Sequence, residues 1–474
     1  MTQTLHLDSM KKIFLGLTVA FFLIVAPEAN AQFIKLLDFI GTNGASPSGS
    51  FVSDGTFLYG MTSLGGTNNK GVIFKIKTDG SGYVKLLDFA GATNGSNPDG
   101  SLFYDGTFLY GMTENGGTNN GGVIFKIKPD GTGDTVLFNF SGLIGLNPHG
   151  SLISDGNFLF GMTANGGTNN NGVIFKINLD GTGYSVLNNF NQVLGANPHG
   201  DLLLDGDSLY GLTYTGGASL YGVIFKIATD GTGYSKLYDF ASVTDAHNPL
   251  GSLITDSIFL YGTTIAGGQN NSGAIFRIKR DGTGYSIIFN MGYSDGAYPY
   301  GSLISDGTYL YGTTMSGGIN NGAGTIFKIK TDGNVFSKMY DFNSNTDGGS
   351  PIGSLISDGN FLYGLASYGD GLNILGTAFK LGLLTDINED KIENHFTISP
   401  NPFYTQTVLR TDNLLKNATF TVYNCFGQSV KKIKNITGQT ITLFRDNLPS
   451  GLYFYRLTEG NKILSVDKLV IIGN

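Results

Sequence analysis

Short apolar segments separated by glycine-rich turns recur seven times along the chain. The central aromatic-glycine pair of each copy has its glycine at Gly60, Gly111, Gly161, Gly211, Gly262, Gly312 and Gly364, so successive copies are 50 to 52 residues apart. In the second copy the apolar segments span residues 101–104, 108–113, 122–128 and 135–140. Asp-Gly pairs, in which both residues accept positive φ, separate the first two segments and the last two, which is a strong hairpin signal. The pattern predicts four antiparallel strands per copy.

The second and third strands of each copy differ in their alternation. The segment FLYGMT at 57–62 is apolar on both sides, whereas in the third segment Val72, Phe74 and Ile76 alternate with a set that includes Lys75 and Lys77. A strand buried on both faces is apolar throughout, and a half-buried strand alternates. We therefore expect the second strand to be sandwiched and the third to lie nearer the rim.

The two ends of the repeat region complement each other. The segment Phe33–Phe39, FIKLLDF, matches the fourth strand of a copy, whereas the seventh copy stops after its third strand near Leu384. A closed ring uses the spare strand to complete the last sheet and leaves no open edge there. The sequence predicts an all-β protein: residues 32–384 form a seven-bladed β-propeller closed by the N-terminal strand. A stacked solenoid is the alternative, but a solenoid does not require that its first strand complement its last repeat.

A different domain follows the repeats. Residues 385–395 are acidic and predict a linker, and residues 396–474 contain short alternating segments bounded by glycine and proline, which indicate a small C-terminal β-sandwich. Its landmark residues are Pro400, Asn401, Pro402, Gly427, Gly451, Tyr453 and Lys468.

The first 31 residues predict a signal peptide. Lys11 and Lys12 precede an apolar run from Ile13 to Ala26, and the small-residue pattern Ala29-Asn30-Ala31 follows it. A membrane-spanning helix needs roughly 20 apolar residues. This run is shorter and no later segment is longer, so we expect an exported protein without a transmembrane anchor.

Composition narrows the possible partners. Only 14% of the 474 residues are charged and the net charge is -7, which excludes the basic surface that nucleic-acid binding needs. Cys425 is the single cysteine, so an intramolecular disulfide is excluded. We expect a monomer that packing and ring closure stabilise.

Candidate binding residues lie where each copy returns from its fourth strand to the first strand of the next. This connection always contains Pro-X-Gly, and in a propeller its end lies at the mouth of the central channel. The proline restricts φ and the glycine frees it, so X is the variable position. X is Ser48, Asp99, His149, His199, Leu250, Tyr300 and Ile352 in order. Four polar and then three apolar residues would suit an amphipathic ligand such as a sugar; the alternative is that X is an exposed turn residue without function.

Metal and cofactor chemistry has little support in the sequence. His149 and His199 occupy equivalent positions and His247 follows nearby, but zinc needs clustered ligands and neighbouring blades could hold these rings too far apart. The repeated Asp-Gly pairs lack calcium-loop spacing, so hairpin chemistry explains them. The Gly-Gly and Asn-Asn loops between the second and third strands suit left-handed turns better than sugar contacts. We expect no metal and no cofactor.

The repeat resembles a known family. The pattern YGMTxxGGTNNxGVIFKIxxDGTGY is similar to the GloVer tandem repeat of exported bacterial proteins with interchangeable C-terminal anchors, over about 33–384. The fourth copy, GGASLYG, and the seventh, GDGLNILG, lack its Asn pair. In period and strand count the repeat also resembles kelch propellers, although the chain has no tryptophan. The GloVer resemblance implies no particular chemistry.

The order and spacing of the C-terminal landmarks resemble the sorting domain of the type IX secretion system of Bacteroidetes. This resemblance implies a second export step across the outer membrane, the secretion machinery as a partner, and a final location at the cell surface or outside the cell. An ordinary accessory domain is the alternative.

Three functions remain open. The first is a non-catalytic propeller that binds a glycan or a protein at the channel mouth. The second is a carbohydrate-active enzyme, a lyase or hydrolase, at the same position; paired carboxylates would be expected there, yet Asp99 is the only acid among the seven X residues. The third is a structural or adhesive surface protein. We expect no catalytic residues, but the sequence leaves the choice open.

Overall fold

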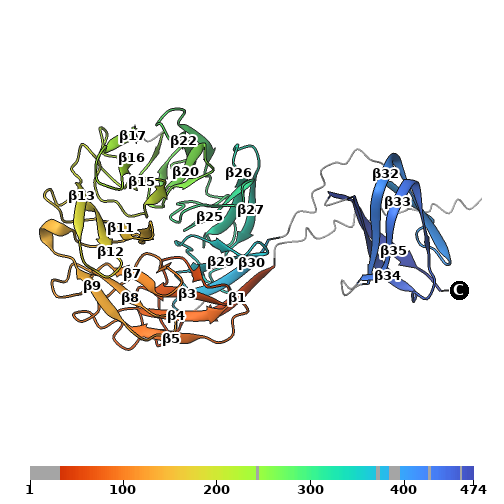
Figure 1. The fold of residues 1–474 in the computed structure, drawn as a ribbon, viewed down its shortest axis with the longest axis horizontal. Coiled ribbons are helices and arrows are strands. Elements are labelled where there is room, and N and C mark those ends of the chain that lie inside the picture. The colour runs from red at the N-terminus through yellow and green to blue at the C-terminus, as the bar shows by residue number, and fades with distance from the viewer. Residues whose placement is uncertain are drawn as a thin grey trace, which may run out of the picture. The chain divides into compact units, whose positions relative to one another are not determined.

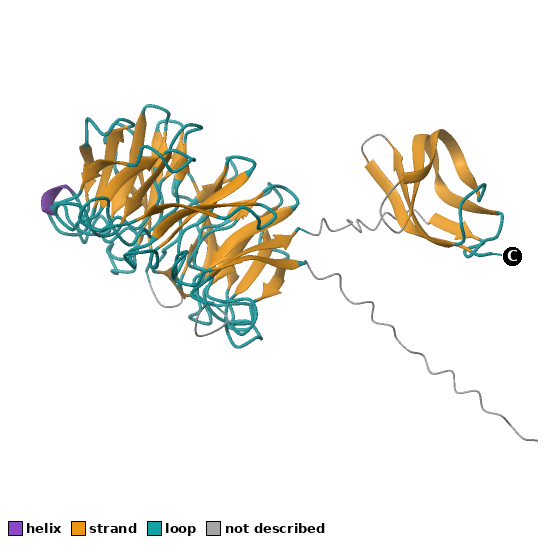
Figure 2. Cartoon of the chain, turned by 90° about the horizontal axis from the view of Figure 1, so that it is seen from below, coloured by secondary structure: helices purple, strands orange, loops and turns teal. Residues whose placement is uncertain are grey.

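The computed structural model describes residues 32–241, 245–369, 374–383, 396–424, 429–459 and 462–473. The chain divides into two compact units, Met1–Leu384 and Thr385–Asn474. The expected signal peptide, residues 1–31, and the expected linker, residues 385–395, lie outside the described residues. Strands make up nearly all regular structure in both units, with one short helical turn, η1 (Gly142–Ile144) (Figure 2).

The first unit is a ring of seven four-stranded antiparallel sheets, as predicted (Figure 1). The innermost strands are β2 (Val52–Ser53), β6 (Phe103–Tyr104), β10 (Ile153–Ser154), β14 (Leu203–Asp205), β19 (Ile254–Thr255), β24 (Ile304–Ser305) and β28 (Ile356–Ser357). The second strands are β3 (Phe57–Thr62), β7 (Leu109–Thr113), β11 (Phe158–Thr163), β15 (Ser208–Thr213), β20 (Phe259–Thr264), β25 (Tyr309–Thr314) and β29 (Phe361–Ala366). The third strands are β4 (Val72–Lys77), β8 (Val123–Ile127), β12 (Val173–Asn178), β16 (Val223–Ala228), β22 (Ala274–Lys279), β26 (Thr325–Lys330) and β30 (Thr377–Gly382). The outer strands are β5 (Val84–Asp88), β9 (Thr135–Asn139), β13 (Ser185–Asn189), β17 (Ser235–Asp239), β23 (Ser286–Asn290), β27 (Phe336–Asp341) and β1 (Phe33–Asp38). A small extra pair, β18 (Ala246–His247) and β21 (Ala266–Gly267), joins two loops.

Ring closure follows the prediction, and the solenoid alternative is wrong. The N-terminal strand β1 pairs antiparallel with β30 and becomes the outer strand of the seventh sheet. The Phe33 ring stacks on Tyr340 of the sixth blade with centroids 4.3 Å apart. Phe39 is fully buried, while the side chains from Phe33 to Asp38 are only half-buried. The strand therefore belongs to the seventh blade by its hydrogen bonds, contacts the sixth through Phe33, and contacts the first through Phe39, whose ring lies 5.1 Å from that of Phe74.

The third strands are more buried than their alternation predicted. Val72, Ile73, Phe74 and Ile76 are all inaccessible to solvent, because adjacent blades pack on both faces of β4. Lys75, which interrupts the apolar pattern, contacts the neighbouring blade. Its Nζ lies 4.8 Å above the Phe57 ring and donates to the Pro129 carbonyl of the next blade at 2.9 Å. The third strand does lie nearer the rim than the second, as expected, but it is buried as fully, and Lys75 bridges blades.

Hydrophobic clusters between adjacent blades form the core. One cluster combines Tyr59 and Ile73 of the first blade with Leu109 and Phe125 of the second, and the same arrangement recurs around the ring. The strand glycine makes room for an aromatic ring of its own blade. A Cβ on Gly60 would lie 2.8 Å from the Phe74 ring, because Gly60 pairs with Phe74 across the two strands.

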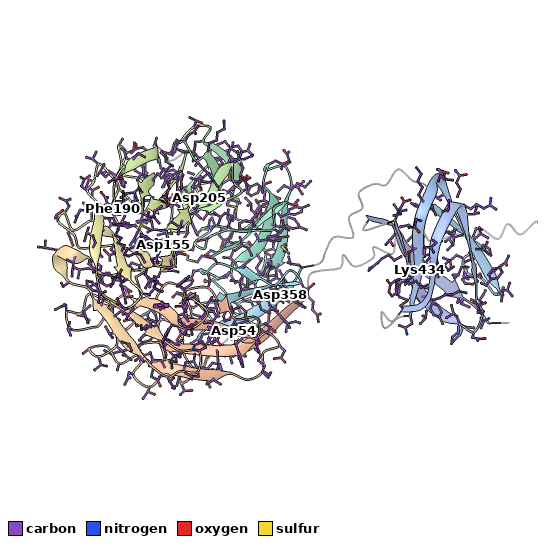
Figure 3. All side chains as sticks on the ribbon, in the orientation of Figure 1. Asp54, Asp155, Phe190, Asp205, Asp358 and Lys434 are labelled. Carbon is purple, nitrogen blue, oxygen red and sulfur yellow. The ribbon has the colours of Figure 1, made fainter. Side chains whose placement is uncertain are left out.

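The Asp-Gly pairs form hairpins by a different mechanism from the predicted one. Gly55 has φ +89°, whereas Asp54 has no positive φ; the Asp54 carboxylate accepts from the Thr56 and Phe57 amides at 2.8 and 2.7 Å. Its second oxygen accepts the Tyr59 hydroxyl at 2.7 Å. Aspartate therefore ties the turn to a core tyrosine. Figure 3 labels Asp54, Asp155, Asp205 and Asp358, four of these first-turn aspartates.

The second unit is one five-stranded sheet in the order β31, β32, β34, β35, with β33 paired to β32. The strands are β31 (Phe396–Ser399), β32 (Gln406–Asn424), β33 (Ser429–Phe444), β34 (Gly451–Glu459) and β35 (Lys462–Ile471). A parallel bridge between Phe403 and Ile471 brings the ends of the sheet together, so it is nearly closed around its own core. The expected two-sheet sandwich is not confirmed.

Two of the landmark residues of this unit, Asn401 and Lys468, meet in space. The Asn401 side chain donates to the Lys468 carbonyl at 2.9 Å and accepts from the Val470 amide at 2.8 Å. The buried Tyr453 donates its hydroxyl to the Pro449 carbonyl at 2.9 Å. Gly451 begins β34, Pro400 and Pro402 flank Asn401, and Gly427 lies outside the described residues. The landmarks are therefore packing and bridging positions.

Deletion of Phe33–Phe39 should unfold the propeller rather than only its seventh blade. The strand buries Phe39 and half-buries six side chains, and full burial of a large apolar side chain stabilises by roughly 1.5 to 3 kcal/mol. The loss would be comparable with the net stability of a domain, about 5 to 15 kcal/mol. Thermal melting and protease resistance of the full chain measure this. The control Ile40→Ser, at an exposed neighbour, should melt like the wild type; an unchanged melting temperature of the deletion would contradict closure.

Ser257→Gly should stabilise the chain. Ser257 replaces the turn glycine and has φ +80°, which costs a residue with a Cβ about 1 to 2 kcal/mol. The reverse change Gly307→Ser, at the equivalent turn with φ +91° and no atom within 4 Å of the added Cβ, should destabilise by a similar amount. The urea unfolding midpoint of each variant, compared with that of the wild type, tests both predictions. Shifts of the same sign in the two variants would show that backbone strain is not the cause.

Candidate functional site

The seven Pro-X-Gly connections converge on one cavity of about 250 Å³ at the inner ends of the blades. All seven predicted positions line it: Ser48, Asp99, His149, His199, Leu250, Tyr300 and Ile352. Each of these side chains is half-buried. The structure thus brings the predicted set together, with the polar residues from blades one to four on one arc and the apolar residues on the other.

The glycines of this motif are required for space, not for positive φ. None of them is in the left-handed region; instead, a Cβ on Gly49 would lie 2.3 Å from the Gly100 carbonyl oxygen. The same contact, from 2.3 to 2.9 Å, continues around the ring and closes from Gly353 back to Gly49. The left-handed residue is the one before the proline, for example Asn97 with φ +55°. Our expectation that glycine frees φ here was wrong.

A belt of hydrogen bonds below the X residues is a feature that the sequence analysis missed. The Ser50 amide donates to the Ser101 hydroxyl at 2.8 Å, and the Ser101 amide donates to Ser151 at the same distance. In the fourth blade Asp201 replaces the serine and accepts the Ser151 amide at 2.5 Å. Asp201 also lines the cavity, so Asp99 is not its only acid. Comparing the residue after each Pro-X-Gly would have found it.

The two histidines lie in contact, although the sequence analysis expected that neighbouring blades could hold their rings too far apart. The His149 and His199 rings have centroids 4.5 Å apart, and His149 Nδ1 lies 2.9 Å from the Asp99 carboxylate. His199 also meets the edge of Tyr214 at 5.5 Å. His247 does not join them: it is buried in β18 against Tyr221 and does not line the cavity.

The electrostatics of this cluster separate the two histidines. Burial is the largest single influence on the pKa values of Asp99, His149 and His199. It disfavours protonated His149, but the hydrogen bond and charge of Asp99 outweigh it, so the pKa of His149 is raised. Burial also opposes the charge of Asp99, yet His149 lowers the pKa of that carboxyl overall. For His199, burial and the neighbouring His149 charge lower the pKa to about 4, so His199 is neutral at pH 7.

One of the seven pre-proline positions carries a large side chain. Tyr298, two residues before Tyr300, has φ +59° and a side chain that is 37% exposed. At the equivalent positions the residue is Ser or Asn, also with positive φ, and Asn248 donates its side-chain amide to the Tyr214 carbonyl of the preceding blade at 2.8 Å. A large residue with positive φ is uncommon. Tyr298 therefore carries more backbone strain than its equivalents.

Other loops have structural explanations. Asn69 accepts the Gly65 amide at 3.0 Å and has φ +53°, and Asn68 donates to the Phe89 carbonyl at 2.9 Å, so the Asn pair shapes its own loop as the sequence suggested. Within the described residues, no group of three or more His, Cys, Asp or Glu side chains is arranged to hold a metal ion. No helix in that part of the chain is long and apolar enough to cross a membrane.

Family models match nearly the whole chain. The Gloeobacter/Verrucomicrobia repeat matches residues 22–170, 133–322 and 281–419, and the secretion system C-terminal sorting domain matches residues 397–472. The sorting domain marks the protein for export to the cell surface or secretion and implies the type IX secretion machinery as its partner. No curated protein matches the chain.

Several solved structures are similar to this chain at low sequence identity. An oligogalacturonate lyase in complex with manganese is 13% identical over 75% of this chain and 94% of the lyase, with a TM-score of 0.52. A puromycin-hydrolysing peptidase of Mycobacterium tuberculosis is 12% identical over 80% of this chain and 60% of the peptidase, with a TM-score of 0.50. PorZ, a surface component of the type IX secretion system of Porphyromonas gingivalis, is 14% identical over 92% of this chain, with a TM-score of 0.45; the chain spans 60% of the length of PorZ.

The two histidines should affect stability with opposite dependence on pH. Because the folded pKa of His199 is about 4 against 6.5 when unfolded, the unfolded chain binds the extra proton and stability falls as pH drops from 6.5 to 4. His199→Gln should remove the part of this acid-side loss of stability that protonation of His199 causes. His149 has a raised pKa, so it stabilises below pH 6.5 and this contribution is lost as pH rises through its folded pKa.

Unfolding free energies of the wild type, His199→Gln and His149→Gln, measured from pH 4 to 8, test the assignment. Both effects appear on the acid side and have opposite signs: towards low pH, His199→Gln should gain stability relative to the wild type and His149→Gln should lose it. A loss of the acid-side decline in His149→Gln instead would show that the assignment is reversed.

Proposed function

Because the chain belongs to the Gloeobacter/Verrucomicrobia repeat family and ends in a type IX sorting domain, we propose that it is an exported surface propeller that binds a glycan. The binding site is the cavity formed by the seven Pro-X-Gly connections. Binding needs no cofactor and no second copy of the chain, so the protein acts as a monomer. A surface protein is the alternative ligand.

One observation carries this proposal: polar and apolar side chains divide the cavity into two arcs. A sugar ring has hydroxyl groups at its edge and C–H groups on its faces. Asp99, His149 and Ser48 can exchange hydrogen bonds with the hydroxyls, and Tyr300 can pack on a face. Convergent polar groups in a concave apolar setting are typical of small-molecule sites. A structural or adhesive protein without a pocket would have no use for this division.

A carbohydrate-active enzyme is the second candidate. Two carboxylates, Asp99 and Asp201, line the cavity, and the hydrogen bond that Asp99 accepts from His149 Nδ1 orients the imidazole. A histidine held by a carboxylate is a common general base, and neutral His199 beside it is a second proton acceptor. These groups permit proton abstraction or acid-base catalysis on a bound sugar.

A glycan array and polysaccharide depletion with the full chain, followed by product analysis in the same tubes, separate the functions. Binding without turnover is the expected result. New reducing ends or unsaturated products would favour the enzyme, and the absence of binding and products would favour a structural role.

Replacement of His149, His199 and Tyr300 together by Ala should abolish binding, since it removes side chains from both arcs. Tyr293→Ala, at a tyrosine that is 59% exposed and does not line the cavity, is the matched control and should bind normally. Retained affinity in the triple variant would move the site away from the cavity.

A further inference from the structure

The repeat provides its own reference for recognising unusual residues. Seven copies of the same connection surround the cavity, so a residue that differs from its six equivalents without improving packing needs another explanation. Two such residues occur here, Asp201 and Tyr298. Both lie at or beside the cavity, and each differs from its equivalents in chemistry as well as size.

Asp201 keeps the structural role of its equivalents and adds a charge. Its Oδ1 accepts the Ser151 amide and its own amide donates to the Ser252 hydroxyl at 2.6 Å, just as a serine at this position would. The second oxygen, Oδ2, has no hydrogen-bond partner among the described residues. A serine would complete the belt without bringing a carboxylate into the cavity. The extra oxygen is therefore available to a ligand.

Tyr298 is the one bulky residue at a position where all seven equivalents have positive φ. Its φ of +59° disfavours a bulky side chain more than it does Asn or Ser, and it lacks the amide with which Asn248 links to the preceding blade. Two residues span at most about 7 Å, so its backbone lies beside that of Tyr300, which lines the cavity. Strain of this kind persists at functional sites. The Tyr298 side chain is 37% exposed and is therefore accessible to a ligand.

The charges of the cavity favour one class of sugar. Asp99 and Asp201 line it, and no lysine or arginine does so within the described residues. The one basic group in it with a raised pKa, His149, is paired with Asp99, and His199 is neutral. An acidic sugar would bring a carboxylate next to Asp201 with no free cation to balance it, and like charges in contact are strongly unfavourable.

We infer that the cavity takes the end of a glycan whose terminal sugar is uncharged or carries an amine, with Asp201 accepting hydrogen bonds from it and Tyr298 packing on the next sugar. At about 250 Å³ the cavity is smaller than the roughly 300 to 1,000 Å³ of sites for drug-sized ligands, so it holds one sugar ring. The rest of the chain then leaves across Tyr298. This inference rests on the proposed glycan function and assigns the sugar class to it.

Two pairs of probes that differ only in charge test the inference with the full chain. Oligogalacturonate is compared with its methyl ester, and chitosan oligomers are compared with chitin oligomers, by calorimetry at pH 7. The neutral or amine-bearing probes should bind at least roughly tenfold more tightly than oligogalacturonate. A lysine-rich peptide tests the alternative that the site takes a protein cation.

Each test variant replaces an unusual residue by one that its equivalents in the other blades carry. Asp201→Ser restores the belt of the other six blades, so it should fold normally, bind the preferred probe more weakly and lose most of the discrimination against oligogalacturonate. Tyr298→Asn should raise the melting temperature, because it relieves strain, yet weaken binding by roughly three- to tenfold. Asp207→Asn, which removes a charge in the same blade outside the cavity, is the control and should change neither.

The outcomes separate the inference from the function on which it rests. Binding of oligogalacturonate as tightly as its ester, or full discrimination in Asp201→Ser, overturns the inference and leaves glycan binding intact. A stabilised Tyr298→Asn with wild-type affinity removes Tyr298 from the site. Binding of the lysine-rich peptide without binding of any sugar probe overturns the inference in favour of a protein ligand. If the glycan array also shows no binding, the proposed function is overturned as well.

Discussion

The contact between successive glycines at the axis is the constraint on which the rest of the propeller depends. Each Pro-X-Gly glycine approaches the next so closely that a Cβ would lie 2.3 to 2.9 Å from its carbonyl oxygen. No other residue fits there without moving a blade. The contact fixes the spacing of all seven connections, and the same spacing allows the serine hydroxyls to accept amides across each gap. The cavity therefore has a rigid floor before any ligand arrives.

Further from the axis, packing between adjacent blades holds the ring together. The inner strands are only two or three residues long, so most burial comes from the second and third strands of adjacent blades. Lys75 and its equivalents contribute by lying over an aromatic ring and donating to a carbonyl of the next blade, which satisfies a charge within the interface. The closing strand β1 makes the seventh interface similar to the others. Because no described blade sheet lacks its outer strand, the ring is held by seven comparable interfaces.

The site uses variation on this uniform scaffold. At the X position a change of side chain costs little, because proline on one side and the glycine contact on the other hold the backbone. Asp99, His149 and His199 use this freedom to form a contiguous polar cluster across three blades, whose members control one another's protonation. Asp201 and Tyr298 go further, since they alter positions that are otherwise structural. Repeat architecture thus makes residues that depart from the pattern visible against their own equivalents.

The sequence by itself determined the number of blades, the strand order, the closing role of Phe33–Phe39 and the seven X residues of the cavity, because each follows from a repeated local pattern. It could not determine contacts between copies. The proximity of His149 and His199, the inclusion of Asp201 in the cavity and the burial of Lys75 depend on the distance between blades, which the glycine contact at the axis sets. The role of glycine itself was hidden for the same reason: positive φ is a local property, whereas a Cβ clash with the next blade exists only after the ring has closed.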